Sequence, residues 1–158
     1  MNDLPEIRRP HVRLMRMGLR DFRNYAGLDL RLDGRHVCLY GANGSGKSSV
    51  YRALRLLADD LAHYCLRDGR RAPPLALSRA QRRWGSCAAD GAIRINWRLI
   101  MAPDAVRRSV VAHEVAHLTH FDHSPAFHAH LGALFEGDVS AANRWLKREG
   151  RSLYAHFG

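Results

Sequence analysis

The stretch VVAHEVAHLTHFDHSPAF, from Val110 to Phe127, holds four histidines and one glutamate. Its first half follows the pattern H-E-x-x-H, in which His113 and His117 bracket Glu114. Residues four apart lie on one face of a helix, so the two histidines can present both imidazoles to one point. Zn²⁺ binds neutral imidazole nitrogen, and a glutamate beside the first histidine can act as a general base toward water. The spacing therefore predicts a hydrolytic zinc site with His113 and His117 as ligands and Glu114 as the base.

A third ligand must come from outside this pair, and two more histidines follow at short range. Ser124 and Pro125 read as a helix N-cap and a first helical residue, so we expect the H-E-x-x-H helix to end near residues 121–122. His120 would then still lie on that helix and project away from the shared point, as a surface or supporting residue. His123 would lie just past the helix end and could fold back. We therefore expect His123 to be the third ligand.

The same pattern can also arise by chance in a helix whose histidines serve only its structure. Val106, Val110 and Val111 precede and enter the motif, which predicts that one side of the helix is buried. Buried imidazoles and a buried carboxylate are costly unless a partner satisfies them. The zinc interpretation is therefore favoured over a purely structural histidine helix.

The segments around the motif predict a mixed α+β fold. LALSRAQRRWGSC and AIRINWRLI read as strands joined by a turn at Ala89–Gly91. Pro103 and Asp104 are expected to open the H-E-x-x-H helix, and a last helix is predicted over about Val139–Glu149. Three side chains of this part are expected to pack in the core: Trp84, Cys87 and Trp97.

The segments RRWGSCAADGAIRINWRLIMAP, VVAHEVAHLTHFDHSPAF and NRWLKREGRSL together resemble the YgjP-like and SprT-like zinc metallopeptidases. The resemblance covers about Leu75 to Leu153, with the elements in the family's order, although the family has a longer β-rich segment before W-G-S-C. It implies a small zincin-like peptidase core that acts on a peptide or protein. It also implies the same site residues: His113, His117 and His123 as ligands and Glu114 as base.

A second motif, GANGSGKS, lies between Gly41 and Ser48 and fits G-x-x-x-x-G-K-[ST]. Such a loop cradles phosphate oxygens with its backbone amides, while its lysine reaches the β/γ-phosphates and its hydroxyl binds Mg²⁺. The apolar run HVCLY before it and a helical pattern after it predict a strand, a glycine loop and a helix. Six residues are candidate ATP/Mg²⁺-binding residues: Gly41, Asn43, Gly44, Gly46, Lys47 and Ser48.

The N-terminal segment LRDFRNYAGLDLRL, together with LYGANGSGKSSVYRALRLL, resembles the Walker A region of SMC/RecF-type AAA-like ATPases. The resemblance covers only about Val12 to Leu61. No apolar strand that ends in Asp-Glu follows, and no Ser-Gly-Gly signature segment is found. Hydrolysis needs an acidic residue that holds Mg²⁺ and orients water, so ATPase activity is not expected. A nucleotide-binding module of the DNA-repair class remains the alternative function.

Composition sets the remaining expectations. The net charge is +10, which invites nucleic-acid contact, but the basic residues are almost all arginines and are spread along the chain. A solvated arginine surface is therefore favoured, with nucleic acid kept as a possible partner. The three cysteines form no C-x-x-C pair, and no apolar run is long enough for a membrane span, so a cytoplasmic protein is expected. The oligomeric state is left open.

The domain organisation follows from the two motifs. Residues 67–76, RDGRRAPPLA, carry charge, glycine and a proline pair, which is typical of a linker. We expect a truncated P-loop segment over residues 1–66, this linker, and a zincin-like metallopeptidase core over residues 77–158.

Overall fold

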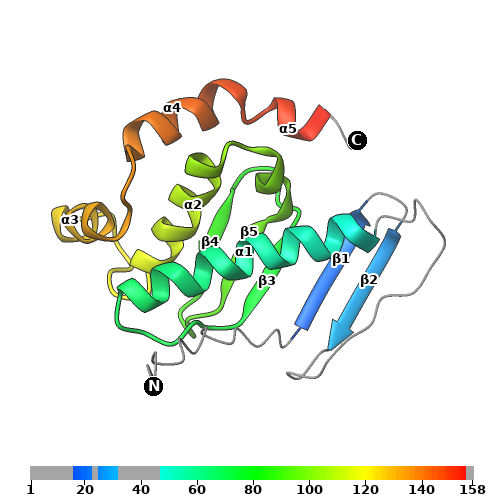
Figure 1. Cartoon of the computed structure of the whole chain (residues 1–158), viewed down its shortest axis with the longest axis horizontal. Helices are drawn as coiled ribbons and strands as arrows, with labels where there is room; N and C mark the ends of the chain where they lie inside the picture. The colour runs from blue at the N-terminus through cyan, green and yellow to red at the C-terminus, as the bar shows by residue number, and fades with distance from the viewer. Residues whose placement is uncertain (1–15, 23–24, 32–46, 156–158) are drawn as a thin grey trace, which may run out of the picture.

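A computed structural model describes residues 16–22, 25–31 and 47–155 of the chain. These residues form five α-helices, one 3₁₀-helix, a three-stranded sheet and a separate two-stranded one (Figure 1). The α+β class expected from the sequence is confirmed.

The three-stranded sheet consists of β3 (Leu75–Ser78), β4 (Gly85–Cys87) and β5 (Ile93–Asn96). Its order is β3-β5-β4, with β5 parallel to β3 and antiparallel to β4, so β4 is an edge strand. Gly91 makes the turn between β4 and β5 with a φ of 80°, and its N–H donates to the carbonyl of Ala88. A positive φ is freely open to glycine, and the predicted turn is confirmed.

The N-terminal strands β1 (Arg16–Phe22) and β2 (Tyr25–Arg31) pair antiparallel. The helix α1 (Lys47–Arg67) follows the glycine motif. Only Lys47 and Ser48 of that motif, as the first backbone residues of α1, lie within the described part of the chain. The apolar run HVCLY and residues 41–46 lie outside it.

The second half of α1 belongs to the same hydrophobic core as the sheet. Leu57, Leu61 and Tyr64 are fully buried in one cluster with residues from β3, β5 and the later helices. Residues 67–76, expected as a linker, hold the last residue of α1 and the first two residues of β3. The hydrophobic core is therefore continuous across this segment, and a separate ATPase-like unit over residues 1–66 stays a prediction.

The helix that carries H-E-x-x-H is α2 (Asp104–Ala116), preceded by the 3₁₀-helix η1 (Trp97–Met101). It packs against α1, α3, α4 and β4, so it is surrounded on several sides (Figure 1). The predicted helix start at Pro103 and Asp104 is confirmed. The chain then continues through α3 (Pro125–Leu134), α4 (Val139–Glu149) and α5 (Ser152–Ala155).

The predicted end of the H-E-x-x-H helix was wrong. The helix ends at Ala116, several residues before residues 121–122, and His117 is its C-cap. The N–H of Leu118 and that of Thr119 bond to carbonyls three residues back, which tightens the chain into a turn. His120 therefore does not lie on the helix. By contrast, Ser124 caps α3 as expected, since its side chain accepts from the N–H of Phe127.

The sequence predicts no membrane-spanning segment. None of the helices in residues 47–155 is both long enough and apolar enough to cross a bilayer. The cytoplasmic location stays a prediction.

Candidate metal centre

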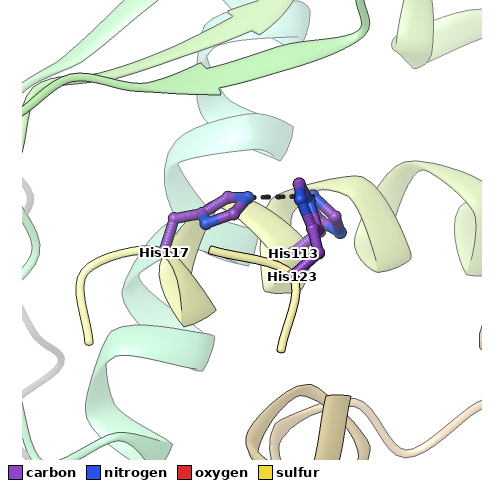
Figure 2. A group of neighbouring side chains, drawn as sticks. All are labelled: His113, His117 and His123. Atoms are coloured by element: carbon purple, nitrogen blue, oxygen red, sulfur yellow. Dashed lines mark hydrogen bonds between the residues drawn. The ribbon is translucent and has the colours of Figure 1, made fainter. Parts of the chain in front are cut away.

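Three imidazole nitrogens converge at the end of α2. The Nε2 atom of His113 lies 3.1 Å from that of His117 and 3.2 Å from that of His123. Figure 2 shows His113 and His117 on one helix and His123 reaching the same point from the chain that follows. Ligands at about 2.05 Å in tetrahedral zinc sites are separated by about 3.3 Å, so the spacing fits a common metal ion. Among the described residues, these three histidines form the group able to hold one.

The ring of His117 is oriented by the backbone of the turn that follows it. Its Nδ1 lies 2.8 Å from the carbonyl oxygen of His120. A carbonyl can only accept, so Nδ1 carries the proton and Nε2 carries the lone pair that faces the other histidines. A backbone carbonyl behind a ligating histidine is a common supporting arrangement in metal sites. His120, expected to be a surface or supporting residue, thus supports His117 through its backbone.

Phe127 of α3 forms the floor of the histidine cluster. It is fully buried, and its ring centroid lies 4.5 Å from that of His117, 4.8 Å from His123 and 4.9 Å from His113. Such close ring contacts limit the rotation of all three imidazoles. Phe127 was not among the candidate site residues, although it is the last residue of the stretch VVAHEVAHLTHFDHSPAF. Only the packing of α3 against α2 places it beneath the site.

The side chain of Glu114 lies against the edge strand β4. A Cβ at Gly85 would lie 2.6 Å from its Cγ and 2.7 Å from its carboxyl carbon, so a side chain at this point would displace the carboxylate. Glu114 is buried, with 5% of its surface exposed. The glycine of W-G-S-C therefore makes room for the carboxylate that the sequence predicts as the base.

Burial shifts the pKa values of Glu114 and of its neighbour His113 in opposite directions. Burial raises the pKa of Glu114 to about 7, and the positive charge of Arg83 opposes that shift. A carboxylate with a pKa near neutrality is suited to take up and release a proton. Burial, with the nearby His117 and His123, lowers the pKa of His113 to about 4. His113 is thus neutral at physiological pH, the form that binds a metal ion.

A cleft of about 240 Å³ opens beside Glu114 and His113. Its walls come from α2, α3, α4 and the start of β4, and they include Trp84 and Leu146. Trp84 was expected in the core; it is half-buried, packs against the core and lines this cleft. Trp97 is buried as expected, while Cys87 is partly buried against the core.

Most of the candidate nucleotide-binding residues lie outside the described part of the chain. Gly41, Asn43, Gly44 and Gly46 are outside the described residues, and Lys47 and Ser48 are described only as the start of α1. Their assignment stays a prediction.

Comparison with known families places the site in context. The family model of the YgjP-like metallopeptidase domain matches residues 48–149, which is more than half of the chain. The match includes the three histidines, Glu114 and Gly85, and it begins within α1. None of the solved structures matches the chain significantly.

Curated relatives match a shorter stretch. The DNA replication and repair protein RecF of Rhizobium etli is 54% identical over 50 residues, which cover 31% of this chain and 13% of that protein. The RecF protein of Agrobacterium fabrum is 53% identical over 47 residues, which cover 30% of this chain and 12% of that protein. The chain therefore spans about an eighth of the length of the curated relatives it matches. The expected RecF resemblance is supported only over this short stretch.

Proposed function

The chain belongs to the YgjP-like metallopeptidase domain family, and on that premise we propose that it is a zinc-dependent peptidase. This proposal rests on two imidazole nitrogens that lie 3.1 and 3.2 Å from the Nε2 atom of His113, and on the buried carboxylate of Glu114 beside it on the same helix. The proposed ligands are His113, His117 and His123, and the proposed base is Glu114. The substrate is a peptide or protein.

The donor set fits zinc. Three imidazole ligands leave a tetrahedral site with one open position, which is the arrangement of catalytic rather than structural zinc. When bound there, zinc supplies Lewis-acid activation of water and polarises the substrate carbonyl.

The side chains of this chain supply the rest of the chemistry. Glu114, with its pKa of about 7, takes the proton of the attacking water and returns it to the leaving amine. Gly85 leaves the space in which the carboxylate lies, and the carbonyl of His120 holds His117 in the ligating tautomer. Phe127 keeps the three imidazoles in place from below.

The test is metal content followed by activity. We expect about one zinc per chain by mass spectrometry, and cleavage of unfolded protein substrates that chelator removes and zinc restores. Glu114→Gln should keep the zinc and lose the activity, whereas the surface variant Glu149→Gln should keep both. Protein that binds no stoichiometric zinc, or an unimpaired Glu114→Gln variant, would refute the proposal.

A second candidate function is nucleotide binding by the glycine motif, as in a DNA-repair ATPase-like module. The short, 54% identical match to RecF favours it. Lys47 and Ser48 would contact ATP and Mg²⁺, as they do in other loops of this pattern. ATP with Mg²⁺ should then raise the melting temperature of the wild type but not of Lys47→Ala. An equal response of both proteins, or none in either, would remove this candidate.

A further inference from the structure

Apolar side chains make up half of the residues that line the cleft beside the candidate metal centre. Five of its lining side chains are apolar: Trp84, Val110, Leu131, Val139 and Leu146. The others are Ser109 and Asn143, together with Gly85, His113 and Glu114 at the end where the reaction is proposed to occur. No lysine or arginine is among the described residues that line it. The cleft therefore joins the proposed reaction centre to an apolar surface.

The polar groups on this wall do little to attract charge. The hydroxyl of Ser109 already donates to the carbonyl of Val106 across 2.9 Å, within its own helix. Asn143 is neutral and exposed at the α4 side. An acidic side chain that entered would lose water and find no opposite charge among these residues, and a basic one would find only Glu114, the proposed base. An apolar side chain would leave water with a gain.

The size of the cleft suits a single side chain. Its volume of about 240 Å³ lies below the range of about 300–1,000 Å³ typical of pockets for whole small molecules. It also opens directly at Glu114 and His113, so its occupant would be attached next to the bond that is cleaved.

Trp84, which lines the cleft, contacts residues of the C-terminal helices α4 and α5. The space beside Gly150, the C-cap of α4, is filled by Trp84, because a Cβ there would lie 2.8 Å from Cζ2 of the indole. The ring of Tyr154 in α5 lies 5.3 Å from that of Trp84. The hydroxyl of Tyr154 in turn donates to the carbonyl of Ala80, in the loop that leads to Trp84. The indole is thus fixed in place, and the cleft is formed before any substrate arrives.

We propose that this cleft binds the side chain of the substrate residue next to the scissile bond and selects a large apolar side chain. The inference rests on the proposed peptidase function. Helix α4, which contributes Val139, Asn143 and Leu146, is then the element that determines specificity.

The first test changes the charge of the wall. A panel of peptides that differ only at the residues flanking the cleaved bond should be cut best next to Leu, Met or Phe. Asn143→Asp should lower kcat/KM for these peptides about 10- to 100-fold, in the range of a pocket that loses its fit to an apolar group. The matched control is Ser140→Asp, which adds the same charge to an exposed site on the same helix outside the cleft. It should leave the preference unchanged.

A second variant tests size rather than charge. Val139→Phe fills the cleft, so cleavage next to Phe should fall while cleavage next to Ala is retained. Cleavage with no apolar preference, or a preference that survives both Asn143→Asp and Val139→Phe, would overturn the pocket while the peptidase function stands.

A binding measurement separates the pocket from the peptidase function. In the zinc-loaded Glu114→Gln protein, N-acetyl-phenylalanine amide should shift the methyl NMR signals of Val139 and Leu146 in a saturable way, and N-acetyl-lysine amide should not. If the wild type cleaves no peptide at all, the proposed function fails, and these methyl shifts decide the pocket alone. Equal shifts with both amides, or none with either, would overturn it.

Discussion

The ring of His117 and the backbone of His120 are joined by a hydrogen bond of 2.8 Å, from Nδ1 to the carbonyl oxygen. The bond exists because α2 stops at Ala116 and the chain turns back at once. In a continued helix the carbonyl of His120 would point along the axis and away from the ring. The early helix end thus supplies the group that sets the tautomer of His117.

Because His120 acts through its backbone and His123 through its ring, substitutions at these two residues should affect zinc binding differently. His123→Ala removes a proposed ligand and should weaken zinc affinity by more than the about 10- to 100-fold loss typical of supporting residues. His120→Ala retains the backbone carbonyl, so its zinc affinity should stay within about threefold of the wild type. Competition with a chromophoric chelator measures both. A His120→Ala affinity as low as that of His123→Ala would contradict the assignment.

Gly85 is expected to be essential for activity but not for metal binding. In Gly85→Ala the new Cβ must displace the Glu114 carboxylate, and a shift of about 1 Å in a reacting group can cost roughly 100-fold in rate. Zinc content should stay the same because the atoms nearest the new Cβ all belong to Glu114 and not to a proposed ligand. Gly132→Ala is the control: apart from its chain neighbours and the backbone of its own helix, no atom lies within 4 Å of the Cβ that alanine would add. Alanine in a helix should stabilise it by about 0.5–1 kcal/mol.

A buried ion pair ties α1 to α2. The Nε of Arg107 lies 2.6 Å from Oδ2 of Asp60, and both side chains are largely buried. Arg107→Met leaves the carboxylate of Asp60 buried without its main partner, which should lower the free energy of unfolding by about 3–5 kcal/mol. Arg55→Met breaks the exposed pair with Asp59 on the same helix and should change it by less than about 0.5 kcal/mol. Urea unfolding of both variants measures the difference.

The second half of α1 should be necessary for the stability of the metallopeptidase core. Leu61 is fully buried, so Leu61→Ala should lower the free energy of unfolding by about 2–5 kcal/mol. Leu66 is 66% exposed on the same helix, and Leu66→Ala should change it by less than about 0.5 kcal/mol. If Leu61→Ala left the unfolding of the zinc-loaded protein unchanged, α1 would not belong to that core.

Alkaline pH should destabilise the fold through Cys65. Burial raises the pKa of its thiol from 9.0 to about 12. Below pH 9 the thiol is protonated in both states; between these values only the unfolded chain releases the proton, so stability falls as pH rises. The loss should approach about 1.4 kcal/mol per pH unit. Cys65→Ala should show a shallower decline between pH 9 and 10.5 than the wild type, while both show the same trend between pH 7 and 8.

The sequence by itself determined the features that depend on neighbouring residues. The H-E-x-x-H spacing places two imidazoles on one helical face, Ser124 and Pro125 start α3, Gly91 makes its turn, and α4 runs over Val139–Glu149 as predicted. Each of these follows from backbone geometry or capping within a few residues, which a single sequence expresses directly.

Only the tertiary structure decided how these elements meet. The end of α2 at Ala116 could not be predicted from spacing, because the helical pattern continues while the turn is held by contacts of His117 and its neighbours. The space for Glu114 at Gly85, the floor at Phe127 and the place of α1 in the core each join residues far apart in the chain. Such contacts depend on how the helices and the sheet pack against one another. Close packing fixes them to within about an ångström. A local sequence pattern does not encode them.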